Sequence, residues 1–416
     1  MHRQGVRLLT SDGHDRDERH STSLELFFDL VFAAAISQLA SALAAHTTAA
    51  GFARFAGLFG VVWWVWVTFT VYADRFGTCD PVHRLALLLA MLLTVGMAAS
   101  LPGAFAGHTT PFVIAYALLK GEQLVLFVRV RRQVPRVRQL YGWHLFVGLF
   151  SLGCWAASLA CGGSARYALW GVAIVAEMVT PWLIAGPAQA APLSISHLPE
   201  RFATLLLIVL GESVARLVGA GALRAGSIQL CVVLAAAFGA ITAMWWTSFK
   251  GVDHGAPGLG RRATLAYMYF QLPMVAGIAA ASAGLRRAIL AADGAGSVHA
   301  GLRAAIYGGV ALYLLAAAAM PTASAALKAR WVRLAAALTT AALVVLGAMV
   351  PPVYQVSALT LVLVAEIAAE RPRARVKPAR PAAAAVRPSR PDGGGGCSRI
   401  GAITGSATAP EPGALG

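Results

Sequence analysis

The segment SLELFFDLVFAAAISQLA, residues 23–40, indicates the type of fold, because it is an apolar run with two acids near its start. Its length and composition are typical of a transmembrane helix, in which about 20 apolar residues cross the bilayer. Glu25 and Asp29 are four residues apart and therefore share one face of that helix. An ionised side chain in the hydrocarbon costs about 2.5–3.5 kcal/mol and nearly always faces a bundle interior or a wet cavity. The stretch therefore predicts a bundle of membrane helices with charged groups inside it.

The composition of the whole chain agrees with a membrane protein. Of 416 residues, 58% are hydrophobic and 12% are charged, whereas soluble domains carry about 25% charged residues. The net charge of +16 does not indicate a nucleic-acid partner, because the Arg residues stand in a tail and in short loops between apolar runs. The polar segment 1–20 lacks the apolar core of a signal peptide, so none is expected. The five Cys show neither metal-ligand nor disulfide spacing, and no metal or cofactor is expected.

Apolar segments separated by Gly, Pro or charge predict an all-α polytopic fold with about twelve spans. Of the loops between spans, those after the even-numbered spans hold most of the Lys and Arg, which predicts that both termini are in the cytoplasm. Residues 371–416 are rich in Arg, Pro, Gly and Ala without periodicity and predict a disordered basic cytoplasmic tail. The expected spans are residues 24–46, 52–73, 83–104, 111–130, 142–161, 166–187, 198–221, 227–249, 263–284, 300–320, 331–350 and 352–370.

Four matches in the same order predict an internal repeat. ELFFDLVFAAAISQLA from Glu25 aligns with ERFATLLLIVLGESVA from Glu200, and VVWWVWVTFTVYAD with AMWWTSFKGVD. HRLALLLAMLLTVGMAAS aligns with RRATLAYMYFQLPMVAGIAAAS, and AIVAE, ending at Glu177, with VLVAE, ending at Glu366. After the cytoplasmic segment 1–20, we expect two parallel six-helix repeats, residues 21–190 and 191–370, related by an axis along the membrane normal.

The ionisable residues inside the predicted spans are candidates for a transport path or a polar core. Five acids against two bases indicate a cation or proton path, or carboxyl groups that stay uncharged. The alternative is an interhelical polar network that fixes helix packing. Glu212 and Arg216 are four apart and can pair directly, whereas Lys120 and Glu122 are two apart and need partners from elsewhere. The candidates are Asp29, Lys120, Glu122, Glu177, Glu212, Arg216 and Glu366.

A second polar cluster, a candidate cytoplasmic entry to the path, is expected at the cytoplasmic ends of the first and seventh spans. It comprises Glu25, His197, Glu200 and Arg201, the last three from the segment HLPER. Glu25 also completes a capping box with Thr22, which is a purely structural role. His197 and Glu200 alone do not make a metal site.

Two segments, TSLELFFDLVFAAAISQLA (22–40) and HLPERFATLLLIVLGESV (197–214), resemble the bacterial low temperature requirement A (LtrA) family. The paired Trp segments are similar to it too, and the likeness covers about residues 20–370. WWTSFKGVD departs from the family pattern of an aromatic residue and an Asp after Trp-Trp, so no role is transferred to Asp253. The resemblance implies a multi-pass bacterial inner-membrane protein linked by name to growth in the cold. It implies no settled biochemical activity.

We therefore expect a transporter or channel-like protein for a small cation, a proton or a proton-coupled solute, with buried carboxylates carrying the path. The alternatives are a membrane sensor or scaffold in cold adaptation, or an intramembrane enzyme. The chain has no GxSxG, HExxH or phosphate-loop motif and only short loops, so no enzymatic activity is expected. The expected partners are the lipid bilayer and a small ion or solute, without nucleic acid.

Overall fold

The computed structural model describes residues 21–76, 81–194, 197–222, 227–250, 261–291, 298–321 and 327–370. These residues are almost entirely helical, and none of them is in a strand. Eleven of the helices in these ranges are long and apolar enough to cross a membrane. The predicted all-α polytopic membrane fold is therefore confirmed. The predicted N-terminal segment 1–20 and tail 371–416 lie outside the described residues.

The helices follow the predicted spans closely in each half of the chain. The first half contains α1 (Ser23–Ala45), α2 (Ala49–Phe76), α3 (Pro81–Phe105), α4 (Thr110–Gln133), α5 (Arg138–Ser158), α6 (Gly163–Leu183) and the short α7 (Ala185–Ala188). The second half contains α8 (His197–Gly221), α9 (Ile228–Phe249), α10 (Arg261–Leu290), α11 (Ala300–Arg303), α12 (Gly309–Ala319), α13 (Leu327–Leu346) and α14 (Pro352–Glu370).

The predicted span 166–187 is the one that differs from the expectation. It corresponds to α6, which has 21 residues but is not among the eleven apolar helices. Arg166, Glu177 and the helix-internal Pro181 lower the mean hydropathy of α6. The sequence also did not predict the short turns, which are η1 (3₁₀, Pro135–Val137), η3 (3₁₀, Gly347–Met349) and the π-turn η2 (Ala304–Gly308) between α11 and α12.

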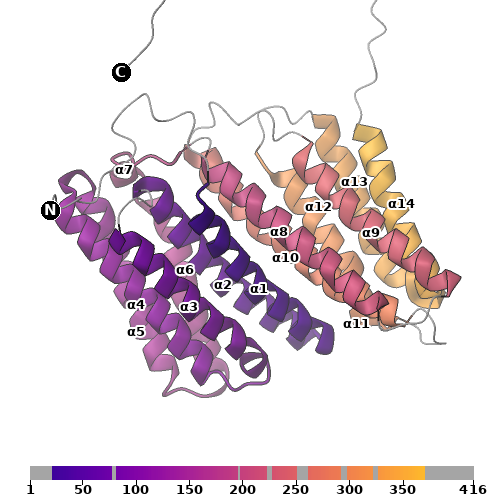
Figure 1. The fold of residues 1–416 in the computed structure, drawn as a ribbon, viewed down its shortest axis with the longest axis horizontal. Helices are drawn as coiled ribbons and strands as arrows, with labels where there is room; N and C mark the ends of the chain where they lie inside the picture. Colours follow the sequence, from indigo (N-terminus) through magenta and orange to yellow (C-terminus); the bar gives the residue numbers. More distant parts are fainter. Residues whose placement is uncertain are drawn as a thin grey trace, which may run out of the picture. The chain divides into compact units, whose positions relative to one another are not determined.

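The two halves share one order of neighbouring helices (Figure 1). In the first half α1 packs against α2 and α3, and α3, α4, α5 and α6 follow one another as neighbours. In the second half α8 packs against α9 and α10, and α10, α12, α13 and α14 follow one another. The predicted repeat requires such an order, but the repeat itself stays a prediction. The halves meet where α1 contacts α8 and α10.

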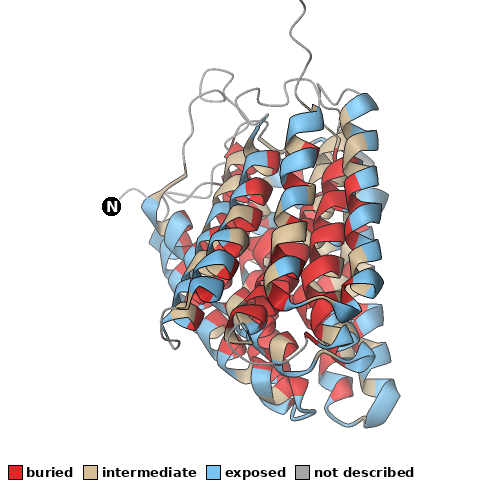
Figure 2. Cartoon of the chain, turned by 90° about the vertical axis from the view of Figure 1, so that its right-hand side faces the viewer, coloured by how far each residue is buried: buried red, intermediate tan, exposed pale blue. Residues whose placement is uncertain are grey.

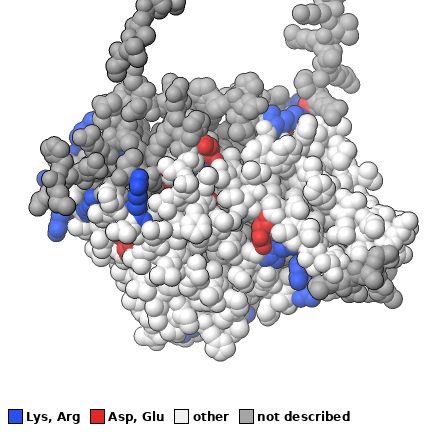
Figure 3. Space-filling model, in the orientation of Figure 1, with Lys and Arg blue, Asp and Glu red and all other residues white. Residues whose placement is uncertain are grey.

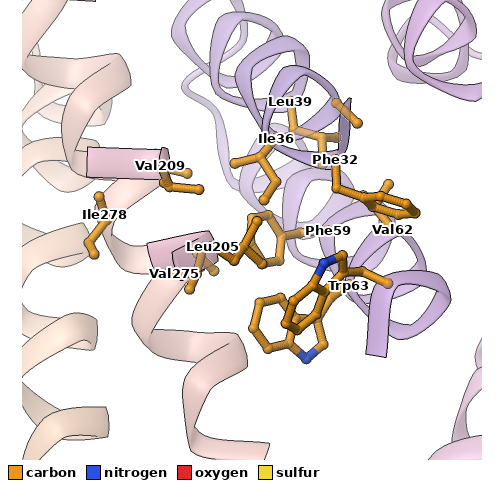
Figure 4. Close-up of a cluster of buried hydrophobic side chains, with 14 of the residues drawn as sticks. Phe32, Ile36, Leu39, Phe59, Val62, Trp63, Leu205, Val209, Val275 and Ile278 are labelled. Carbon is orange, nitrogen blue, oxygen red and sulfur yellow. The ribbon is translucent and has the colours of Figure 1, made fainter. Parts of the chain in front are cut away.

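The contact between the halves includes an apolar core (Figure 4). α1 and α2 supply buried aromatic and branched side chains, and α8 and α10 supply mainly branched ones. Trp63 is 3% exposed, and its ring lies 5.8 Å from that of Phe202 on α8. The core includes Phe32, Ile36, Leu39, Phe59, Val62, Trp63, Leu205, Val209, Val275 and Ile278.

The outer surface of the bundle is apolar, as a surface in contact with lipid must be. Figure 2 shows buried residues on the inner faces of the helices and exposed residues on the outer faces. Many exposed residues are large and hydrophobic, such as Leu85, Phe146 and Leu338. Figure 3 shows wide areas of one face without any Lys, Arg, Asp or Glu. The charged side chains of the spans are instead turned largely inward.

Candidate functional site

An ion pair joins the two motifs with which the halves begin. Arg201 on α8 holds Asp29 on α1 with two hydrogen bonds, from Nε to Oδ2 at 3.1 Å and from Nη2 to Oδ1 at 2.5 Å. Trp66 on α2 donates its indole N–H to the same carboxylate at 2.8 Å. Asp29 is fully buried and Arg201 is 1% exposed. The opposite charges, rather than water, therefore compensate each other.

Glu25 extends this pair by one turn toward the start of α1. Its carboxylate lies 3.3 Å from Nη1 of Arg201 and 3.6 Å from Nε2 of His197. It also accepts the backbone N–H of Thr22 at 2.8 Å, while Thr22 Oγ1 accepts the N–H of Glu25 at 3.3 Å. The predicted capping box is therefore confirmed. The other ring nitrogen of His197, Nδ1, lies 3.0 Å from Oδ1 of Asp74 on α2.

We call this set the buried charge network; its members are Glu25, Asp29, Trp66, Asp74, His197 and Arg201. They come from α1, α2 and α8, and all are buried. Glu200 is half-buried on the same helix end and accepts the backbone N–H of Ser21 at 3.3 Å. Because each carboxylate of the network has basic or N–H partners, the network fixes three helices in one arrangement and offers a migrating cation no bare carboxylate.

A second buried ion pair lies inside the first half. Nζ of Lys120 on α4 donates to Oε2 of Glu177 on α6 at 2.6 Å and to Oε1 of Gln123 at 2.8 Å. The hydroxyl of Tyr116 donates to the other oxygen of Glu177 at 3.3 Å. Lys120 is 5% exposed and Glu177 6%. Glu177 is thus the partner on another helix that Lys120 was predicted to need.

The Lys120–Glu177 pair lines a cavity of about 330 Å³. Its walls come from α2, α4, α5, α6 and α10 and from residues 188–193. It lies toward the end of the bundle at which α2 and α6 finish and α5 and α10 begin. Apolar and aromatic side chains form most of the wall, and Arg75, His144 and Arg261 add further polar groups. Small-molecule sites in proteins have volumes of about 300–1,000 Å³ and this same mixture of apolar wall and few polar groups.

The predicted pair of Glu212 and Arg216 forms on α8, with Arg216 Nε 3.4 Å from the carboxylate. It is tied to α1, because Ser37 Oγ donates to Glu212 Oε1 at 2.5 Å and Arg216 donates to the backbone carbonyl of Ser37 and to Ser41 Oγ. The Glu212 side chain is 38% exposed. This pair links α1 to α8 and does not line the cavity.

Glu366 on α14 is the counterpart of Glu177 in the predicted repeat, yet it does not line the cavity. It accepts the hydroxyl of Thr247 on α9 at 3.0 Å and lies 3.7 Å from Nε of Arg333. Arg333 binds Glu370 more closely, at 2.7 Å. The matching position in the second half therefore holds a local cluster in which two acids, Glu366 and Glu370, lie beside Arg333, and Lys250 Nζ lies 3.5 Å from Glu370.

Glu122 differs from the other acids. Both of its carboxylate oxygens are buried, and neither has a hydrogen-bond partner among the described residues. An unsatisfied buried acceptor costs about 1–3 kcal/mol. We therefore expect Glu122→Met to raise the free energy of unfolding by about 1–3 kcal/mol in detergent micelles, measured by chemical unfolding. Glu177→Met, which removes a paired carboxylate, is expected to lower it. A loss of stability in Glu122→Met would contradict the lack of a partner.

The sequence did not single out several residues of these sites. Asp74, Arg75 and Arg261 stand beside loops whose basic residues were attributed to topology alone. Arg75 is 7% exposed and turns into the cavity. Their positions could have indicated this role, because each of these charges lies within one turn of a span end. A side chain there can point into the bundle. No three His, Cys, Asp or Glu of the described ranges lie close enough together to hold a metal ion.

The chain is similar to known sequences over nearly all of its helices. A model of the family described as "Bacterial low temperature requirement A protein (LtrA)" matches residues 20–368. An uncharacterized protein of Rhizobium meliloti (strain 1021) is 30% identical over 287 residues, which are 63% of this chain and 68% of the relative. No solved structure matches the chain. The multi-pass membrane protein described here therefore belongs to the bacterial low temperature requirement A (LtrA) family.

Proposed function

We propose that this protein is a carrier that moves a small solute across the bacterial inner membrane, with the cavity beside Lys120 and Glu177 as its solute site. The observation that supports this most directly is a buried ion pair on the wall of a cavity of about 330 Å³ inside membrane-spanning helices. Ionisable residues within spans commonly mark substrate and ion pathways. On this proposal the protein is a carrier and not an enzyme.

A solute site is favoured over a bare cation path by the way in which the acids are paired. Asp29 is held by Arg201, Glu177 by Lys120 and Glu212 by Arg216. These carboxylates are compensated by bases, so the excess of acids counted in the sequence does not leave a row of free negative charges. Glu122, without a partner among the described residues, is not on the cavity wall.

The proposed orientation places the cavity near the cytoplasm. It lies toward the end at which α2 and α6 finish and α5 and α10 begin. The basic segments are at this end, as in RVRRQVPRVR (129–138), which runs from the last turn of α4 to the first residue of α5. Cytoplasmic loops carry the excess of Lys and Arg. The proposal therefore keeps both termini in the cytoplasm and gives the site access from that side.

Glu177→Gln and Glu366→Gln form a matched test of this function. Both glutamates are buried at corresponding positions of the predicted repeat, but only Glu177 lines the cavity. The purified full-length protein in sealed liposomes is assayed for uptake of phenyl phosphate, glutamate, glucose and choline, and for proton and potassium flux. We expect one of these species to cross with the wild type and with Glu366→Gln. Glu177→Gln should reduce that flux to the level of protein-free liposomes, because Lys120 is left without its counter-charge in the site.

Two results would contradict the proposal. The first is that no species crosses the wild-type liposomes faster than protein-free ones. The second is that Glu177→Gln carries as much flux as Glu366→Gln while both variants remain folded, because the cavity would then not be part of the path.

A further inference from the structure

The charges around the cavity are predominantly positive. Lys120, Arg75 and Arg261 line it, against the single carboxylate of Glu177. The carboxylate is already engaged by Lys120 at 2.6 Å. The two arginines are therefore not neutralised by the acid that the wall provides.

Arg75 and Arg261 use only part of their hydrogen-bonding capacity. Nε of Arg75 donates to the backbone carbonyl of Ala191 at 3.1 Å, and Nη2 of Arg261 donates to that of Pro181. Within the described part of the chain neither guanidinium forms an ion pair with a carboxylate. A guanidinium has five N–H donors, so each arginine keeps donors beyond these bonds and, at Arg75, beyond its contact with the Tyr141 hydroxyl on the same wall. Both guanidinium groups lie on the wall of one cavity, so an anion between them would relieve the repulsion of their like charges.

The remaining wall is aromatic. The rings of Trp64 and Tyr269 lie 5.9 Å apart on opposite helices, α2 and α10. The rings of Tyr72 and Phe127 are stacked at 6.4 Å. All four side chains line the cavity. Aromatic walls offer a large apolar contact area to a flat partner.

We propose that this cavity binds a small organic anion, with a carboxylate or phosphate at Arg75 and Arg261 and a flat apolar body against Trp64, Tyr269 and their aromatic neighbours. This assignment rests on the proposed function, since it names the class of solute for the same cavity. Arginine suits such an anion because its planar fork matches the two oxygens of a carboxylate or phosphate. The volume of about 330 Å³ is that of a small ligand.

Three analogues with one body and different charges test the assignment. Naphthalene-2-carboxylate, naphthalene-2-carboxamide and naphthalen-2-ylmethylammonium are titrated calorimetrically into the full-length protein in detergent micelles, with protein-free micelles as the blank. Because charge-assisted hydrogen bonds to arginine are lost in the amide, we expect the carboxylate to bind at least about 10-fold more tightly. The ammonium compound should bind most weakly.

Arg75→Gln and Arg303→Gln are the matched variants. Both arginines are buried and donate to backbone carbonyls, but Arg303 is not on the cavity wall. We expect Arg75→Gln to weaken carboxylate binding by about 10-fold and to leave amide binding unchanged. Arg303→Gln should bind like the wild type. Arg261→Gln, at the other guanidinium, repeats the test if Arg75→Gln does not fold.

The anion can come from solution or from a lipid headgroup, and one competition separates these sources. Displacement of naphthalene-2-carboxylate by phosphatidylglycerol, but not by phosphatidylcholine, identifies an anionic lipid as the ligand. Displacement by neither supports a soluble anion.

Equal binding of all three analogues, or binding of none, overturns the assignment. So does unchanged carboxylate binding in the folded Arg75→Gln and Arg261→Gln proteins. The binding and flux experiments test the anion assignment and the carrier function separately. Charge-selective binding without flux of any species in liposomes would overturn the carrier function alone, whereas flux with charge-blind binding would overturn the anion assignment alone.

Discussion

Arg201→Met is expected to lower the free energy of unfolding by about 3–5 kcal/mol, because it removes one partner of a buried ion pair. Arg201 contributes two hydrogen bonds to Asp29 and one to the backbone carbonyl of Glu25, and it lies 3.3 Å from the Glu25 carboxylate. Without the guanidinium, two fully buried carboxylates lose their strongest cationic partner, and Asp29 keeps the indole N–H of Trp66. The loss is therefore much larger than that of a surface pair, which is about 0–1 kcal/mol.

Chemical unfolding in micelles measures this change. The control is Arg54→Met, which removes an exposed arginine whose bond is to the carbonyl of Phe105, and we expect it to cost less than about 1 kcal/mol. The double variant Arg201→Met with Asp29→Leu should be more stable than Arg201→Met alone, because it no longer buries that unpaired charge. An Arg201→Met protein as stable as the control would contradict the assigned role of the network.

Most residues of this network could be predicted from the sequence, but the pairs that they form across helices could not. Asp29, Glu25, His197 and Arg201 stood out as charges at the starts of two apolar runs. Asp29 and Arg201 are separated by 172 positions, and their contact depends on how α1 and α8 lie side by side, which no local pattern encodes. Only Glu212 and Arg216, four apart on one helix, could be paired in advance.

The cavity could be predicted even less. Its wall requires five helices and a connecting segment to leave a volume between them. Arg75 and Arg261 obey the positive-inside rule in the sequence, and this rule explains their presence without any reference to a ligand. Counting acids inside the spans therefore indicated a cation path, whereas the structure brings more bases than acids to the cavity. The spans themselves were predictable because the bilayer imposes their length and composition.

Gly309→Ala is expected to destabilise the protein by about 1–3 kcal/mol, although alanine is the better helix former. A Cβ at Gly309 would lie 2.7 Å from the backbone N of Ala281 and 2.7 Å from the carbonyl oxygen of Gly277, both on α10. These neighbours are backbone atoms in the middle of a buried helix and cannot turn aside as a flexible side chain could. α10 and α12 would have to separate, as expected where small residues let membrane helices approach closely.

Gly308 is the matched control, because a Cβ there meets nothing within 4 Å. Gly308→Ala should raise the free energy of unfolding by about 0.5–1 kcal/mol, through the ordinary helix preference of alanine over glycine. The two variants differ by one position and carry the same added methyl group, so opposite signs in chemical unfolding would isolate the contact between α10 and α12. If both variants were more stable than the wild type, the contact between α10 and α12 could accommodate a methyl group, which would contradict the prediction. Since α10 also carries Arg261 and Tyr269 on the cavity wall, loss of the contact should weaken naphthalene-2-carboxylate binding in Gly309→Ala and not in Gly308→Ala.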